Sequence, residues 1–213
     1  LQTVKDSGSV GLLAAAVFSF SKDGIGDDEV RRAILNSGHV EKRAAAAQLS
    51  EQVSSVDDSQ TTSASAVDSD WELLLRQEDL RVYRRRVSNR VNFFEYKCEG
   101  TYRDISPMKF YQAQMDLEYR KCWDHQIISI DVLEKDENTG SEVIRWIMRF
   151  PYPMYPREYT FVRRSCIDPD KKTIVITCKA VHRSLTPKVK KCVSVRDYFS
   201  CMTIRYRSDI TEV

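Results

Sequence analysis

The stretch from residue 144 to 164, IRWIMRFPYPMYPREYTFVRR, constrains the fold of this 213-residue chain more than any other. Apolar side chains alternate with mostly basic ones as far as Phe150, which is the period of a strand with one buried face. Three prolines follow within residues 151–156, and proline fits neither a helix interior nor a central strand. A second alternating segment begins at Tyr159. The stretch therefore predicts two strands joined by a stiff proline corner.

The two parts of the chain differ in charge. Residues 1–70 carry 6 Lys and Arg against 11 Asp and Glu, whereas residues 71–213 carry 27 against 20. A mildly basic globular part is compatible with anionic lipid surfaces or nucleic acid as partners, and equally with an ordinary solvated surface. The basic residues are spread over predicted strands rather than gathered on one helix, which argues against nucleic acid.

The cysteines and histidines form no recognisable metal site. All six cysteines lie within residues 71–213 without a CxxC spacing, and the three histidines are scattered. We expect reduced cysteines that act mostly as packing residues, in the cytosol or another reducing compartment. The sequence indicates no cofactor.

The first 70 residues divide into segments of different character. The apolar run Val10–Phe20 has 11 residues, too few to span a bilayer as a helix, and fits a signal segment, an interfacial anchor or one side of a short helix. Residues 27–52 have a helical pattern, and residues 54–70 are small, polar and acidic, as in a linker. We expect an apolar and helical segment over 1–53, a flexible acidic linker over 54–70 and a folded domain over 71–213.

The folded part predicts an α+β protein with a curved antiparallel sheet. A short helical turn is expected directly after Trp71. Strands are expected near residues 81–87, 91–100, 128–132, 144–150, 159–162, 174–180 and 195–204, with a hairpin turn over 137–140. Ser106 followed by Pro107 predicts a helix start, and a second short helix is expected over 116–124. The count is seven strands, with both helices inserted after the second.

No catalytic motif is present: the chain has no GxSxG, no Gly-rich phosphate loop and no HExxH. Glu118, Asp124 and His125 lie close in sequence, but acidic residues and a single histidine at this spacing are usually exposed on the surface of a helix. We therefore expect a protein that is not an enzyme.

Aromatic and arginine side chains are more informative. Arg120 lies in a predicted helix between Tyr119 and Trp123, and an inward-facing arginine needs a partner. A phosphate suits the guanidinium fork; an ion pair to a nearby carboxylate (Asp116, Glu118 or Asp124) is the simpler interpretation. Three further rings lie on apolar strand faces: Trp146, Tyr159 and Tyr198. They could form a cation–π box for a quaternary ammonium, or plain core.

The chain resembles a known family at two places. These are YRKCWD, residues 119–124, and WIMRFPYPMYPREYTFVRR, residues 146–164, and the likeness extends from Trp71 to Ile204. Both are similar to START lipid-transfer domains of the phosphatidylcholine-transfer subgroup. The resemblance implies a helix-grip fold, in which a curved antiparallel sheet wraps round a long carboxy-terminal helix and one lipid lies in the tunnel between them.

The resemblance also assigns roles to residues. It implies that Arg120 meets the lipid phosphate and that Trp146, Tyr159 and Tyr198 enclose the choline. Gln114 and Ser200 match two further lipid-binding positions, where the family's phosphatidylcholine transfer protein has Tyr and Gln.

Function and location follow from the resemblance as expectations. These are non-enzymatic binding and transfer of a phospholipid, phosphatidylcholine first, between membranes that include mitochondrial ones, in the cytoplasm and at the mitochondrial outer membrane or intermembrane space. The alternative is a sensor or interaction module for another phospholipid or a sterol. After Arg205 only YRSDITEV remains, so we expect a START domain that is incomplete at its carboxy terminus and lacks the gripping helix, with the apolar face of the sheet uncovered.

Overall fold

The structure is a computed structural model that describes residues 18–35, 70–88, 90–91, 93–170, 172–181 and 191–206. The chain forms two compact units, which we describe separately. The larger contains residues 1–37 and 111–205, and the smaller contains residues 38–110 and 206–213. The larger unit holds the two strands around the proline corner and every candidate site residue.

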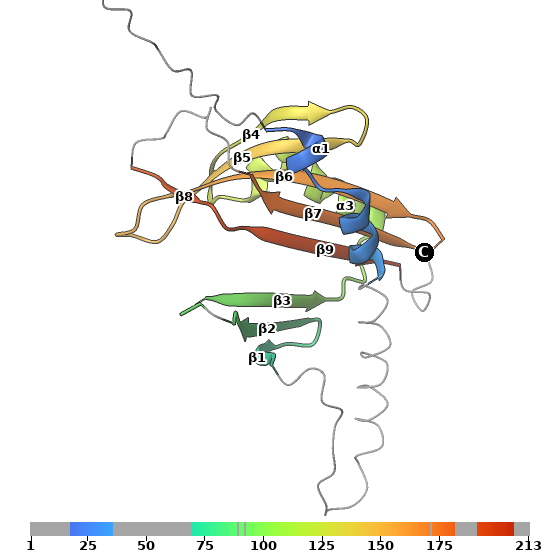
Figure 1. The fold of residues 1–213 in the computed structure, drawn as a ribbon. Helices are drawn as coiled ribbons and strands as arrows, with labels where there is room; N and C mark the ends of the chain where they lie inside the picture. Colours follow the sequence, from blue (N-terminus) through green and yellow to red (C-terminus); the bar gives the residue numbers. More distant parts are fainter. Residues whose placement is uncertain are drawn as a thin grey trace, which may run out of the picture. The chain divides into compact units, whose positions relative to one another are not determined.

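The larger unit is built on a curved sheet that is almost entirely antiparallel. Its strands are β4 (Ile127–Asp136), β5 (Ser141–Met148), β6 (Arg157–Asp168), β7 (Thr173–Ala180) and β9 (Phe199–Arg205), paired in that order (Figure 1). A three-residue strand, β8 (Val193–Val195), pairs in parallel with the start of β6.

The predicted pair of strands around the proline corner is confirmed. β5 and β6 are antiparallel with Trp146 opposite Tyr159, and the chain turns through residues 149–156 between them. Phe161 lies with these two rings in a hydrophobic cluster on one face of the sheet, and Val162 lies in a cluster on the other. Because strand side chains alternate, this one register sends the aromatic rings to a single side.

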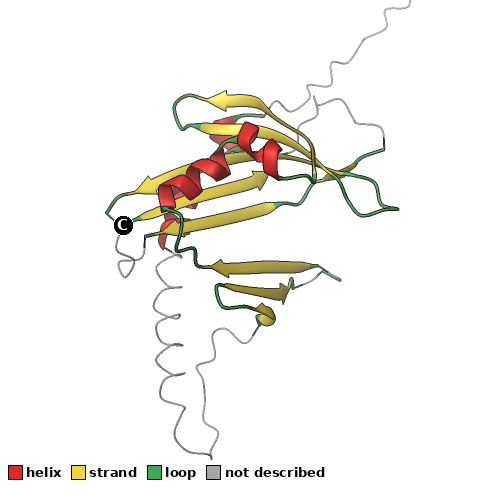
Figure 2. Cartoon of the chain, turned by 180° about the vertical axis from the view of Figure 1, so that it is seen from behind, coloured by secondary structure: helices red, strands yellow, loops and turns green. Residues whose placement is uncertain are grey.

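Helices α3 (Pro107–Met115) and α4 (Leu117–Trp123) supply the cover on the aromatic face (Figure 2). Of α3, residues 111–115 belong to the larger unit. The helical side chains that pack against the sheet are Tyr111, Met115 and Leu117. We call this side the aromatic face below.

The helix start predicted at Ser106 and the hairpin turn predicted over 137–140 are confirmed, and the structure adds a helix cap at Asp116. The Ser106 hydroxyl oxygen accepts a hydrogen bond from the Lys109 N–H at 3.3 Å, and the Asp116 carboxylate accepts one from the Tyr119 N–H at 2.8 Å. These side chains satisfy backbone donors that a helix start leaves unpaired. The hairpin between β4 and β5 ends at Gly140, whose φ of +66° favours glycine.

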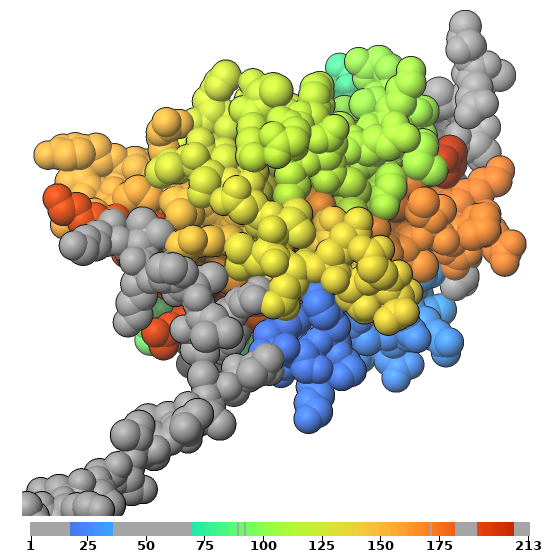
Figure 3. All heavy atoms as spheres, turned by 90° about the horizontal axis from the view of Figure 1, so that it is seen from above, coloured from blue at the N-terminus to red at the C-terminus, as the bar shows by residue number. Residues whose placement is uncertain are grey.

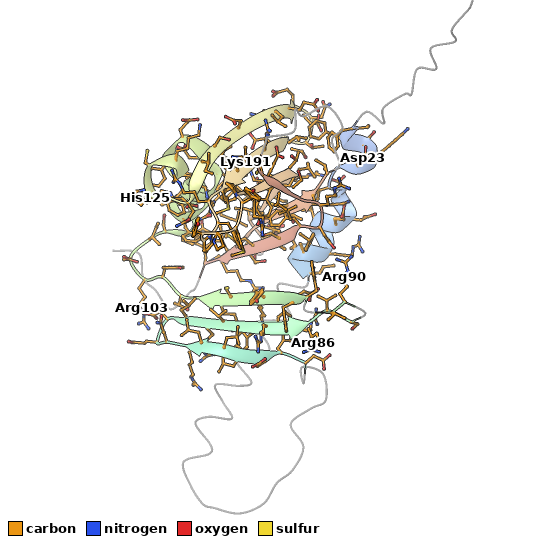
Figure 4. All side chains as sticks on the ribbon, turned by 90° about the vertical axis from the view of Figure 1, so that its left-hand side faces the viewer. Asp23, Arg86, Arg90, Arg103, His125 and Lys191 are labelled. Carbon is orange, nitrogen blue, oxygen red and sulfur yellow. The ribbon has the colours of Figure 1, made fainter. Side chains whose placement is uncertain are left out.

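The opposite face of the sheet is covered by an amino-terminal segment that contains α1 (Phe20–Asp23) and a helical stretch over residues 27–35. In Figure 3 this blue segment and the green helices lie on opposite sides of the yellow strands. In Figure 4, Asp23 from this segment and His125, which follows α4, likewise lie on opposite sides of the sheet. Ile25, Val30 and Ile34 of the segment pack against Val143, Val162 and Val175 of the sheet.

Two basic side chains of the sheet hold the amino-terminal segment by polar contacts. Arg164 donates to the Ile25 carbonyl at 2.8 Å and to the Asp27 carboxylate at 2.6 Å. Lys179 contacts the Glu29 carboxylate at 3.3 Å. Burial by itself raises the pKa of Glu29, but the Gly26 N–H and the Lys179 ammonium outweigh it, so that the pKa is lowered overall.

Only part of the predicted amino-terminal organisation falls within the described residues. Of the apolar run, Phe18 and Phe20 pack against the buried cluster. The predicted helix is present over residues 27–35, and its remainder and nearly all of the predicted linker lie outside the described part. Across the described ranges, no helix is long and apolar enough to cross a membrane.

Replacing Ile34 by alanine tests whether the amino-terminal segment is part of the folded core. We expect Ile34→Ala to lower the free energy of unfolding by about 2–4 kcal/mol, because its side chain is 8% exposed and packed on the sheet. Its neighbour Leu35 is 59% exposed, and Leu35→Ala should change stability by less than about 0.5 kcal/mol. Urea unfolding followed by fluorescence measures both; equal effects would contradict the packing.

The smaller unit is a three-stranded antiparallel sheet of β1 (Glu72–Arg76), β2 (Leu80–Arg86) and β3 (Phe94–Gly100), in that order. Figure 4 shows Arg86 and Arg90 at one end of this sheet and Arg103 at the other. The helical turn predicted after Trp71 is wrong, because residues 72–76 form a strand. A short apolar run fits either structure by periodicity, and pairing with β2 decides it.

The predicted strand count also needs correction. The described residues contain nine strands, because β1 and the short β8 were missed, and the helices α3 and α4 therefore follow the third strand. The strand predicted near Ile128, Ile130 and Val132 is present as β4. Only Ile130 is buried, since β4 is an edge strand with a register shift on each side of this segment.

Candidate ligand site on the aromatic face

Arg120 is the charged centre of the aromatic face. It projects from α4 with a side chain that is 20% exposed. One terminal nitrogen donates to the Gln114 amide oxygen at 3.2 Å, and Nε lies 3.7 Å from the Asp124 carboxylate. The guanidinium lies over the Trp146 ring, 4.7 Å from its centroid, and 5.1 Å from that of Trp123. The ion pair with Asp124, one of the two sequence interpretations, is present, and the guanidinium also faces aromatic rings; the phosphate partner stays a prediction.

The electrostatics of Arg120 leave room for an anion. Burial lowers the pKa of this guanidinium, and Asp124 opposes that shift. Arginine nevertheless stays charged in proteins. Its Nε is buried and makes no hydrogen bond within the described residues. A buried cationic donor with one distant carboxylate has unused capacity for a negatively charged oxygen.

The three predicted rings lie together, linked by a fourth that the sequence analysis had not assigned to the site. Tyr159 and Tyr198 meet edge to face with centroids 5.4 Å apart. Phe161 joins both halves of the cluster, at 5.3 Å from Tyr198 and 6.3 Å from Trp146. Phe161 alternates in phase with Tyr159 along the same strand, and this was the sequence signal that could have identified it.

Two polar groups of this cluster are notable. The indole nitrogen of Trp146 is buried and makes no hydrogen bond within the described part of the chain. Burial raises the pKa of Tyr198 to about 12, and a side-chain hydrogen bond with Ser200 opposes the rise. The phenol is therefore neutral at physiological pH.

The six predicted site residues thus all lie on the aromatic face, in two connected groups. Gln114, Arg120 and Trp146 are linked through the guanidinium, and Tyr159, Tyr198 and Ser200 are linked through the Tyr198 ring and hydroxyl.

Arg163 is a polar residue of this face that the sequence analysis missed. It is 7% exposed and contacts Glu142 and the end of α3. Its position two residues after Phe161 on β6 places it on the same side of the sheet, and an arginine in phase with the buried rings was the available signal.

The cysteines and other possible metal ligands form no cluster among the described residues. All six cysteines are free, and the described residues contain no group of three or more His, Cys, Asp or Glu that could hold a metal ion. His182, which the sequence places near Cys178, lies outside the described residues.

The buried thiol of Cys178 gives a pH-dependent prediction. Burial raises its pKa from 9.0 to about 11, so the thiolate fraction at pH 8 is about 100-fold below that of an ordinary thiol. We expect iodoacetamide to label exposed Cys122 far faster than Cys178 in the folded protein, and both equally in urea, as measured by peptide mass spectrometry. Since only the unfolded chain releases this proton near pH 9, the stability contributed by Cys178 is complete below pH 9 and falls as the pH approaches 11. Equal labelling of the folded protein would contradict the burial.

Comparison with known proteins identifies the family. The model of the START domain matches residues 51–210, and the chain belongs to the START domain family. The predicted resemblance and the α+β helix-grip class are thereby confirmed; the predicted absence of the gripping helix concerns the end of the chain, where residues 207–213 lie outside the described part.

The curated proteins that resemble this chain include two kinds of lipid transfer protein. StAR-related lipid transfer protein 7, mitochondrial, from Mus musculus is 37% identical over 142 residues, which are 67% of this chain and 38% of the relative. The Homo sapiens protein of that name is 32% identical over 203 residues, 93% of this chain and 55% of the relative. Phosphatidylcholine transfer protein from Mus musculus is 28% identical over 137 residues, 63% of this chain and 62% of the relative. The chain thus spans less than two thirds of each relative.

Solved structures agree on the fold. A STAR-related lipid transfer protein fragment from Xanthomonas axonopodis superposes with a TM-score of 0.57 at 17% identity, over 66% of this chain and 76% of that one. At this identity the likeness concerns the fold alone.

Proposed function

We propose that the protein is a non-enzymatic carrier that binds a phospholipid, phosphatidylcholine first, on the aromatic face of the larger unit. The observation that carries the proposal is the half-buried Arg120 guanidinium, held against the Trp146 ring with an Nε that makes no hydrogen bond within the described residues. The names of the relatives, which include a phosphatidylcholine transfer protein, support the same ligand class.

The headgroup chemistry suits these residues. A phosphate can accept hydrogen bonds from the Arg120 fork more strongly than a neutral acceptor could. The rings of Trp146, Tyr159 and Tyr198 present faces and edges that attract a quaternary ammonium by cation–π interaction. Gln114 and Ser200 add polar groups at the two ends of this constellation. A zwitterionic headgroup fits a site that offers a cation beside aromatic rings.

The acyl chains need an apolar lining. Side chains of this kind surround the rings on the same face: Met115, Ile127, Ile130, Met202 and Ile204. Apolar lipid surface shielded from water contributes about 25 cal/mol per Å². Such a lining holds the chains without discriminating strongly between them.

The bound lipid itself tests this proposal. Native mass spectrometry of the purified protein, after incubation with vesicles of mixed phospholipids, sterol and ceramide, should find phosphatidylcholine bound at one molecule per chain. A sterol or ceramide as the preferred ligand would favour the alternative, a sensor of another hydrophobic molecule. Such a ligand would leave Arg120 without a role.

We further propose that the carrier works between membranes that include mitochondrial ones, as the name of two relatives suggests. The proline corner offers a surface for touching a bilayer. Tyr152 is 96% exposed, and Phe150, Met154 and Tyr155 are 42–55% exposed. The Arg157 guanidinium lies 4.5 Å from the Phe150 ring centroid. Aromatic rings beside basic groups are typical of side chains at a membrane interface.

Substitution of the corner tests the membrane contact. We expect Phe150→Ser with Tyr152→Ser to weaken binding to phosphatidylcholine and phosphatidylserine vesicles by about 10-fold, because two rings no longer leave water. Vesicle co-sedimentation measures this. Ile167→Ser, at an apolar site near the other end of β6 that is exposed to about the same extent as Phe150, is the control. A control that weakens binding as much as the double variant would remove the corner from the proposal.

A further inference from the structure

We propose that Arg163 is a positioning residue for the phosphate site and acts through Gln114 and the junction of α3 and α4. This role rests on the proposed function, because it concerns how Arg120 is held for a phosphate. Arg163 itself is 7% exposed and lies against the backbone at the end of α3.

Three contacts fix the Arg163 guanidinium. One terminal nitrogen donates to the Gln114 carbonyl at 3.2 Å, and the other donates to the Met115 carbonyl at 3.0 Å and to the Glu142 carboxylate at 2.7 Å. The two carbonyls belong to the last turn of α3, where a helix leaves its acceptors without partners. The last turn of α3 contains no basic residue of its own. Arg163 therefore supplies from the sheet the cation that the carboxy-terminal end of this helix favours.

The same helix turn holds the side chain that contacts Arg120. The Gln114 carbonyl is bound by Arg163, and the Gln114 amide oxygen accepts from Arg120 at 3.2 Å. Asp116, the residue directly after α3, caps the start of α4, the helix that carries Arg120. The Arg163 guanidinium thus fixes the backbone of Gln114. It also fixes the junction of α3 and α4, beyond which Arg120 projects.

A further contact anchors α3 one turn earlier. The Tyr111 hydroxyl lies 2.9 Å from the Ser165 hydroxyl, two residues beyond Arg163 on β6. With α3 tied to the sheet at two points, loss of the Arg163 contacts should loosen the Gln114 turn without releasing the helix.

The neighbouring arginine provides a matched control. Arg164 points to the opposite face and also binds backbone and carboxylate oxygens, with one carbonyl, of Ile25, where Arg163 has two, and one carboxylate, of Asp27. A lysine at either position keeps the charge but cannot spread its donors over the same acceptors. Arg163→Lys and Arg164→Lys therefore remove comparable contacts, and only the former lies next to the phosphate site.

The experiment compares two ligands with matched acyl chains, phosphatidylcholine and diacylglycerol, which lacks the phosphate together with the choline that it carries. We expect Arg163→Lys to reduce the preference for phosphatidylcholine by roughly 10-fold, within the range for coupled residues of one network. Arg164→Lys should lower the thermal midpoint and leave the preference unchanged. If Arg163 acts through Gln114, Gln114→Ala and Arg163→Lys together should reduce the preference no more than the stronger single variant does.

The outcomes are distinct. A preference retained in Arg163→Lys, or additive effects with Gln114→Ala, overturns the positioning role and leaves the proposed function intact. A wild-type protein that binds both lipids equally overturns the proposed function, and the positioning role falls with it.

Discussion

Replacement of Arg120 by alanine should reduce phosphatidylcholine binding by roughly 100-fold, the factor that corresponds to about 3 kcal/mol for a charge-assisted contact. The guanidinium is the one basic group that contacts Gln114, Asp124 and the Trp146 ring together among the described residues. Its loss removes the phosphate partner and leaves the Asp124 carboxylate, which is 14% exposed, beside the headgroup. Uptake of fluorescent phosphatidylcholine from vesicles measures the effect.

Lys121, the next residue, provides a control that distinguishes loss of the Arg120 contacts from loss of one positive charge on α4. Lys121 follows Arg120 on α4, and its side chain is 37% exposed and paired with Glu118. Lys121→Ala removes the same charge from the same helix and should change uptake less than about two-fold, because exposed ion pairs contribute little. Unchanged uptake in Arg120→Ala would remove Arg120 from the headgroup assignment.

The largest loss of stability is expected for Phe161→Ala, at about 3–5 kcal/mol. This side chain is 3% exposed and joins the Trp146 ring to the Tyr198 ring at the centre of the aromatic face. Its removal leaves a cavity between side chains from β5, β6 and the start of β9. We also expect weaker lipid binding, since the rings proposed for choline lose the neighbour that separates them.

Phe199 offers a control of identical chemistry. It lies on β9 next to Tyr198 but is 66% exposed, so Phe199→Ala should change the free energy of unfolding by less than about 0.5 kcal/mol. Urea unfolding at pH 7, where Tyr198 and Cys178 are protonated in both states, compares the two variants. Equal losses would show that the exposure of these two rings is not as described.

Periodicity predicted what depends on local alternation. The pairing of β5 with β6, the shared side of Trp146 and Tyr159, and the helix start at Ser106 all follow from side-chain period and capping chemistry. The phosphate-binding role expected for Arg120 came from the resemblance to START domains. The residues alone did not favour it, because an arginine between aromatic residues also suits an ordinary ion pair.

Strand pairing explains the errors. The leucine run of β1 is equally compatible with a helical turn, and its pairing with Arg81–Arg84 of β2 makes it a strand. The three residues of β8 are too few for a period to emerge, and their parallel pairing with the start of β6 defines them. β1 pairs with the next strand of the chain and β8 with a strand more than 30 residues before it, and in neither case does the propensity of the run itself decide between the alternatives.

The amino-acid order by itself determined which side of each strand is apolar and where the helices begin, because both depend on neighbours within a few residues. Only the tertiary structure decided that Phe161 joins the predicted rings, that Arg163 holds the end of α3, and that residues 18–35 cover the far face of the sheet. Those contacts join residues that lie far apart in the sequence. Burial of apolar side chains and pairing of charges bring these residues together on folding, and a local sequence pattern contains no information about such partners.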